Sequence, residues 1–167
     1  MDHSGAGAAA PMSREGVDHA LRRLRDERDR ISASLLDLDG HHGSRLLEGA
    51  RLTGETWRRW ENAKAGMLAL WTLFEAYQRV LDTATELRER SRHPDADTLV
   101  ELSALLSGPS VELPEEEVPL RERPLLGPKG RRVTLEEAVT LMIDAFEFVT
   151  GEVAAADAAW SELLMPL

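Results

Sequence analysis

The stretch "DLDGHHGS", residues 37–44, places two carboxylates beside two imidazoles. Side chains of these kinds bind zinc, iron or manganese. Adjacent histidines rarely reach one ion together, however, and di-metal helical bundles use a Glu-x-x-His motif that this sequence lacks. A solvated turn explains every residue, because Gly40 can end one helix and Ser44 can begin the next. We therefore expect no metal and no cofactor, and the low-ranked candidates for a metal site are Asp37, Asp39, His41 and His42.

Other patterns that carry chemistry are missing from the sequence. There is no cysteine, which excludes disulfides and thiol nucleophiles. Neither a G-x-S-x-G nor an H-E-x-x-H pattern occurs. The segment "LLGPKGRR" at 125–132 contains glycine and lysine without the spacing of a phosphate-binding loop. Because these motifs are missing, we expect that the protein is not an enzyme.

The composition indicates a globular chain of one domain. Of its 167 residues, 43% are hydrophobic and 30% are charged. No apolar run is long enough to span a membrane, and residues 1–12, "MDHSGAGAAAPM", resemble no signal peptide, so we expect a cytoplasmic protein with a disordered tail at 1–12 and one domain at 13–167. The net charge of −10 disfavours binding to nucleic acid. Arginine far outnumbers lysine, which is typical of a high-GC, bacterial source.

Apolar residues recur at helical spacing over most of the chain. The spacing predicts a first helix at 13–39, in which Arg28 interrupts an apolar seam and either pairs with a carboxylate or extends into solvent. It predicts a second, continuous helix at 44–92, although Gly54 is a possible break. Pro94 ends this helix.

Two further helices follow. The third is predicted at 95–107, capped by an aspartate and stopped at Gly108. The fourth is predicted at 134–164, where Thr134 and Glu137 form a capping box.

The segment 108–133 separates the third and fourth helices and contains five prolines. Regular helix is excluded there, and proline limits sheet pairing. The segment is nevertheless too apolar for a free linker, so we interpret it as an extended strap laid on the bundle, with a possible second role in docking another protein. Its candidate docking residues are Val118, Leu120, Leu125 and Leu126.

These elements predict an all-α fold: an elongated antiparallel bundle of three long helices and one short helix, with a Pro-rich strap before the last helix. The helix at 44–92 is longer than its predicted neighbours can cover, so part of its apolar stripe would lack a partner within the chain. The expected function is therefore a scaffold or adaptor that forms a homo-oligomer, a complex with another protein, or both. The expected interface anchors are Trp57, Trp60, Trp71, Phe74, Tyr77, Phe146 and Trp160.

Charge is distributed unevenly. From residue 133 onward the chain carries seven carboxylates and neither lysine nor arginine. The fourth helix should therefore prefer the second helix, the basic parts of the strap, or a basic partner surface.

Two alternative functions remain open. One is a helical sensor that binds a metal or small ligand through residues 37–42. A weaker one is a nucleic-acid-associated regulator that uses "WRRW" at 57–60 and "KGRR" at 129–132.

Overall fold

The structure is a computed structural model that describes residues 10–48, 54–114 and 131–164, and their side chains except at 39–48, 54–57, 157 and 159–164. Its elements follow in chain order: α1 (Arg14–Glu48), α2 (Gly54–Arg90), α3 (Ala96–Ser107), β1 (Val111–Glu112), β2 (Arg132–Val133) and α4 (Leu135–Leu164). The predicted all-α bundle of three long helices and one short helix is confirmed.

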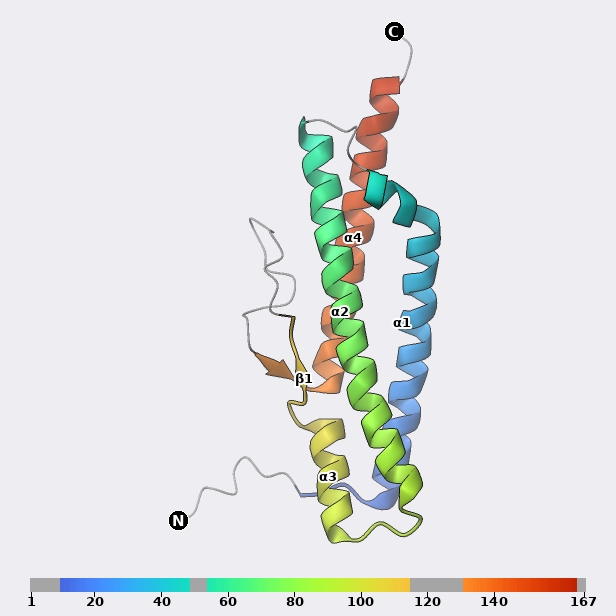
Figure 1. Cartoon of the computed structure of the whole chain (residues 1–167), viewed down its shortest axis with the longest axis vertical. Coiled ribbons are helices and arrows are strands. Elements are labelled where there is room, and N and C mark those ends of the chain that lie inside the picture. Colours follow the sequence, from blue (N-terminus) through green and yellow to red (C-terminus); the bar gives the residue numbers. More distant parts are fainter. Residues whose placement is uncertain (1–9, 49–53, 115–130, 165–167) are drawn as a thin grey trace.

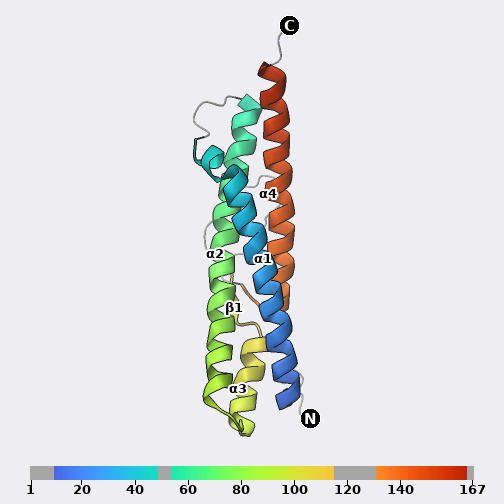
Figure 2. The same ribbon diagram turned by 90° about the vertical axis from the view of Figure 1, so that its right-hand side faces the viewer.

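The helices form a bundle in which α1 and α2 lie side by side, and the third position beside them is occupied first by α3 and then by α4 (Figure 1). The α2 helix runs antiparallel to both α1 and α4, and α1 and α4 run in the same direction (Figure 2). At the end where α1 begins, α3 packs against α1 and α2. Further along the bundle, α4 takes over that place and continues to the opposite end. The short helix and the last long helix therefore cover α2 in series.

For the described side chains of α2, this arrangement contradicts the expectation that part of the second helix lacks a partner in the chain; the part of the predicted helix at 44–57 lies outside them. Between Trp60 and Ala84, the apolar stripe of α2 is buried against the other helices, with Trp71 half-buried at its edge. Two further side chains of α2, Ala69 and Leu73, are also buried. The buried arc of α2 is wide because this helix contacts α1 on one side and α4 on the other.

The boundary between the first two helices differs from the prediction. The α1 helix does not end at Gly40 but continues through 41–44 to Glu48, bending toward the rest of the bundle in Figure 1. A glycine inside a helix costs only about 1 kcal/mol relative to alanine, which the helix formers that follow can offset. The predicted single helix at 44–92 is also wrong, because residues 44–48 belong to α1 and α2 begins at Gly54.

The ends of the strap pack on the bundle, as predicted. Val111 pairs with Val133 in a short antiparallel ladder, and the Leu113 N–H donates to the Arg131 carbonyl at 3.0 Å. Val111, Leu113 and Val133 are all buried. The candidate docking residues in the middle of the strap, Val118, Leu120, Leu125 and Leu126, lie outside the described residues.

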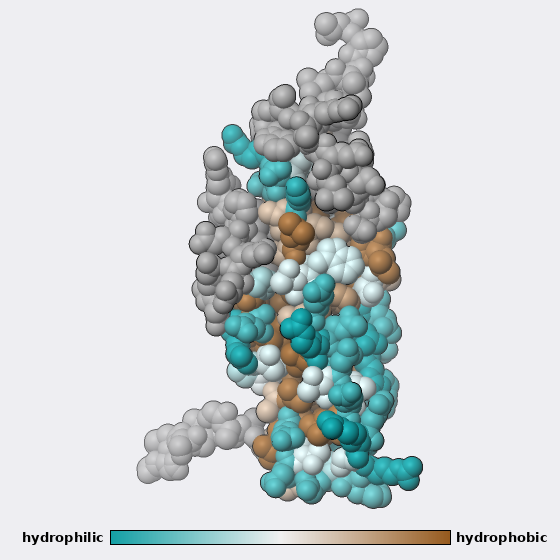
Figure 3. Space-filling view, viewed as in Figure 1, coloured by the Kyte–Doolittle hydropathy of each residue, from teal (hydrophilic) through white to brown (hydrophobic). Residues whose placement is uncertain are grey.

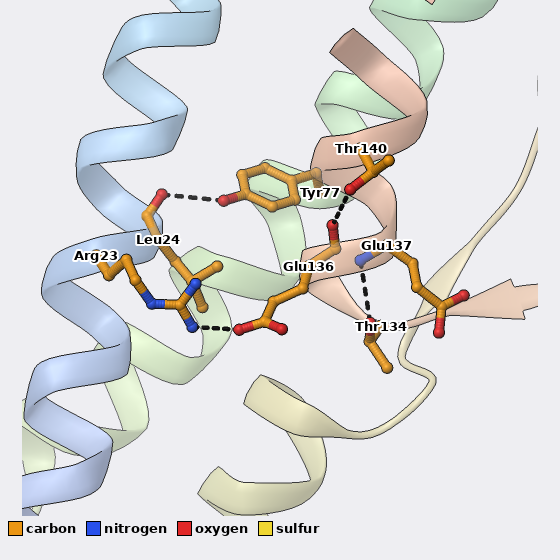
Figure 4. Close-up of polar contacts among 7 residues, drawn as sticks. All are labelled: Arg23, Leu24, Tyr77, Thr134, Glu136, Glu137 and Thr140. Atoms are coloured by element: carbon orange, nitrogen blue, oxygen red, sulfur yellow. Dashed lines mark hydrogen bonds and ion pairs between the residues drawn. The ribbon is translucent and has the colours of Figure 1, made fainter. Parts of the chain in front are cut away.

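Local capping follows the sequence. The Ser13 hydroxyl accepts from the Gly16 N–H at 3.0 Å, and the Asp95 carboxylate accepts from the Thr98 N–H at 2.8 Å. The Thr134 hydroxyl accepts from the Glu137 N–H at 3.1 Å (Figure 4). These bonds satisfy backbone donors that the first turn of a helix cannot pair.

Polar contacts in the middle of α1 join it to α2. The buried Tyr77 hydroxyl donates to the Leu24 carbonyl at 2.9 Å (Figure 4). Burial raises the pKa of the Tyr77 phenol, so it remains a protonated donor. Arg28 pairs with Asp82 of α2 at 3.7 Å and with Asp29 at 3.2 Å, which confirms the predicted pairing of this arginine with a carboxylate.

The end of the bundle that holds the start of α1 is closed by an ion pair and by the segment before α1. The Arg88 guanidinium donates to both carboxylate oxygens of Asp18, at 2.7 and 3.2 Å, and to the Ser91 carbonyl at 2.9 Å. The Met12 N–H donates to the Ser103 hydroxyl of α3 at 2.7 Å, and the Met12 side chain packs against the core. Met12, the last residue of the predicted tail, thus belongs to the packed bundle.

The Asp18–Arg88 pair should make stability depend on pH. Hydrogen bonding from Arg88 holds the pKa of Asp18 below its ordinary value of 3.8. A carboxyl whose pKa is lower in the folded state adds stability above its unfolded pKa, and this contribution disappears as the pH falls through the folded pKa. Urea unfolding should therefore show Asp18→Asn to be less stable than the wild type at pH 7, by at most about 1 kcal/mol because the pair is partly exposed.

That difference should shrink as the pH falls below 3.8. Glu75→Gln, at an exposed carboxylate of α2, is the matched control for the loss of one negative charge. A constant difference between Asp18→Asn and the wild type across the acid range would contradict the assignment.

Candidate interaction groove

An apolar groove lies between α1 and α4 and is floored by α2. Its volume is about 360 Å³. It is built from two successive turns of each outer helix, because residues three and four apart share a helix face. The floor is formed by Ile31, Leu35, Leu70, Met142 and Phe146, and the edges by Glu27, Arg30, Ser34, Ile143 and Glu147.

The floor of the groove is part of the protein core, whereas its α4 edge is open. Leu35, Leu70 and Met142 are buried, and Phe146 is half-buried against them. Ile143 is 46% exposed and lies next to Met142 on the outer side of the seam. An exposed isoleucine at the mouth of an apolar groove is a surface on which another apolar side chain can pack.

The two edges of the groove differ in charge. On the α4 edge, Glu147 is exposed and forms no ion pair with another described residue. On α1, Arg30 projects into solvent and pairs with Glu27 one turn earlier, at 3.0 Å. Below this point, Arg23 of α1 and Glu136 at the start of α4 form an ion pair that holds the two helices together (Figure 4).

Two further carboxylates of α4 bind within the chain. Arg59 and Asn62 of α2 donate to the Glu152 carboxylate at 3.1 and 3.3 Å, which confirms the expected preference of the acidic helix for the second helix. Arg131, in the basic end of the strap, donates to Glu137 at 3.3 Å. The contact between Glu136 and α1 was not predicted, because no local pattern brings these two helices together.

The described interface anchors lie in or against the core of the chain. Trp60, Phe74 and Tyr77 are buried, and Trp71 is half-buried with its ring edge-on to Phe74 at a centroid distance of 6.1 Å. Phe146 reaches the groove. The side chains of Trp57 and Trp160 lie outside the described residues.

Two further exposed leucines lie outside the lining of the groove. Leu36 on α1 and Leu68 on α2 are 61% and 55% exposed. In Figure 3, brown side chains lie among teal ones over α2 and at the edge formed by α1.

Only one of the predicted metal candidates has a described side chain. Asp37 is exposed on α1, and the side chains of Asp39, His41 and His42 lie outside the described residues. Among the described side chains, no group of three or more His, Asp or Glu residues could hold a metal ion.

The "WRRW" segment is partly used within the fold. Trp60 is buried and Arg59 pairs with Glu152, so neither is free to stack on a base or to contact a phosphate. Arg58 is exposed.

None of the described helices is long and apolar enough to cross a membrane. Comparisons with protein-family models, curated proteins and solved structures give no match to this chain.

Proposed function

We propose that this chain is a non-catalytic interaction subunit whose groove between α1 and α4 binds an α-helix of a protein. The observation that carries the proposal is the apolar floor, open to solvent beside the exposed Ile143. A helix that lies in a groove uses apolar side chains three and four residues apart, which is the spacing that lines this groove. Such a helix would also complete a four-helix arrangement around α1, α2 and α4.

The charged side chains around the groove support a polypeptide as the occupant. Arg30, Glu27 and Glu147 stand at its edges, where they can pair with side chains that flank an apolar stripe. Rim charges of this kind add little affinity, but they select the partner and its register.

The proposal is tested by photo-crosslinking in the cell of origin. A benzophenone amino acid replaces Ile143, and the matched control carries it at Val100, an apolar residue of α3 that is 52% exposed and distant from the groove along the chain. We expect a covalent adduct with a protein from position 143 and not from position 100. Absence of an adduct at 143, or equal labelling from both positions, would contradict the proposal.

A further inference from the structure

One face of α2 is exposed along the middle of the helix, and we call it the outward face of α2. Five exposed residues recur on it at helical spacing: Glu61, Leu68, Thr72, Glu75 and Arg79. Other faces of α2 pack against α1, α3, α4 and β1. Leu68 is a large apolar side chain, 55% exposed, near the middle of the outward face.

The charges of the outward face form a pattern that reverses its signs when the helix is turned end to end. Glu61 and Arg79 lie at equal distances on either side of Leu70, and they have opposite charges. Lys64, half-exposed at the edge of this face, and Glu75 are nearly equidistant from the same point and are also of opposite charge. The members of the two pairs are about five and about three helical turns apart, so each pair shares one side of the helix. None of these four side chains forms an ion pair with another described residue.

We propose that the outward face of α2 binds the same face of a second copy of this chain. The two α2 helices are antiparallel, about a two-fold axis that passes near Leu70 at right angles to both. Glu61 of each copy then faces Arg79 of the other, and Lys64 of each copy faces Glu75 of the other. Two convex helix faces can pack side by side in this way, and isologous contacts are the commonest form of homodimer.

Charge selects this register over its neighbours. An axis at Leu68, about half a turn earlier, would set Glu61 against Glu75. An axis about half a turn later would set Lys64 against Arg79. A parallel arrangement of the two helices would set each charged residue against its own copy. Like charges across an interface oppose association, so the antiparallel register near the middle of the face is favoured.

Apolar side chains lie where the axis passes. Leu68 is within one turn of Trp71, which is half-buried at the edge of the apolar stripe of α2. On α1, Leu36 is 61% exposed and lies about two turns beyond Arg28, which pairs with Asp82 of α2. Because α1 and α2 are antiparallel, Leu36 is level with the middle of α2 and borders the contact. Burial of exposed large apolar side chains favours association.

The first experiment measures the mass of the full chain by sedimentation equilibrium over a range of concentrations. We expect the wild type to dimerise, and Leu68→Glu to raise the dissociation constant by at least about tenfold, a change of about 1.4 kcal/mol. Ile143→Glu is the matched control, because Ile143 is 46% exposed at the groove and takes no part in this contact. Urea unfolding at a concentration where the wild type is monomeric verifies that each variant is folded.

The second experiment reverses the charges of one pair. Lys64→Glu and Glu75→Lys should each weaken dimerisation about fivefold, because each change sets two pairs of like charges against each other in the dimer. The double variant should recover most of the wild-type affinity. Positions 64 and 75 are roughly 16 Å apart along one helix, too far to pair within a chain, so recovery reports contact between copies. Asp144→Lys, at an exposed carboxylate of α4, is the control and should leave dimerisation unchanged.

Several results would overturn the inference. These are a wild type that stays monomeric at the highest concentrations reached, a dimer insensitive to Leu68→Glu, a dimer lost on Ile143→Glu, or a double charge reversal that does not recover affinity. The inference and the proposed function fail separately, because they concern different surfaces. Crosslinking from position 143 tests the groove, whereas Leu68→Glu and the charge reversals test the outward face of α2.

Discussion

Replacement of Leu73 by alanine should destabilise the fold by about 2–5 kcal/mol, whereas Leu68→Ala should change stability by no more than about 0.5 kcal/mol. The two leucines lie on the same helix and lose the same atoms, but Leu73 is 0% exposed and Leu68 is 55% exposed. The large difference follows because removal of buried methyl groups leaves a cavity that the surrounding helices fill only in part. Leu73 does not line the groove, so its effect should be on stability alone.

Urea unfolding followed by circular dichroism gives both free energies. A change in midpoint with an unchanged slope would show that stability, rather than the compactness of the unfolded chain, has altered. A larger loss for Leu68→Ala than for Leu73→Ala would mean that α2 is rotated from the orientation described, with Leu68 rather than Leu73 facing the core.

The comparison between these two leucines also shows what the sequence could predict. The apolar period of the second helix identified a stripe through Leu70, Phe74 and Tyr77, and these residues are buried. It did not identify Leu73, because a period locates the centre of a buried face but not its width. The width depends on how many helices surround α2, which is a property of the whole fold.

Local signals predicted helix ends well where a side chain satisfies the backbone. Ser13, Asp95 and Thr134 all cap as expected, because a capping bond spans only three residues. Gly40 was misinterpreted as a stop, since glycine lowers helix stability by a small amount and the rest of the helix decides the outcome.

The candidate groove could not be derived from the sequence. The apolar period predicts that its floor residues face the core. The groove itself exists because α1 and α4 meet only through part of their length. Their separation depends on α2 and on the ion pair between Arg23 and Glu136. The one available signal was Ile143, an apolar residue directly beside the seam residue Met142. Serial coverage of α2 by α3 and α4 was equally inaccessible, because it depends on how the strap returns the chain to the bundle.

The residue that ends α3, Gly108, provides the second large effect on stability. Its N–H donates to the Ala104 carbonyl at 3.1 Å. A Cβ atom at position 108 would lie 2.5 Å from that same carbonyl oxygen. Because the contact is with backbone, α3 or the following strand must shift, and Gly108→Ala should destabilise the protein by about 1–3 kcal/mol.

Gly151→Ala is the matched control and should have the opposite sign. Gly151 lies within α4, and a Cβ atom there would meet nothing within 4 Å. Alanine at this position should therefore stabilise the helix by about 0.5–1 kcal/mol, because glycine loses more conformational freedom on folding.

Thermal and urea unfolding of the two single variants and their double variant test both effects. Gly108 lies at the end of α3 and Gly151 inside α4 with no neighbouring atom within 4 Å of a Cβ, so the two changes share no contact and should act additively. Destabilisation by Gly151→Ala together with a neutral Gly108→Ala would contradict the packing described. Destabilisation by Gly108→Ala would affect the whole fold, because Gly108 joins α3 to β1. The β1 strand pairs with β2, which leads into α4. A shift there would move α3 relative to α4, and these are the two helices that together cover α2.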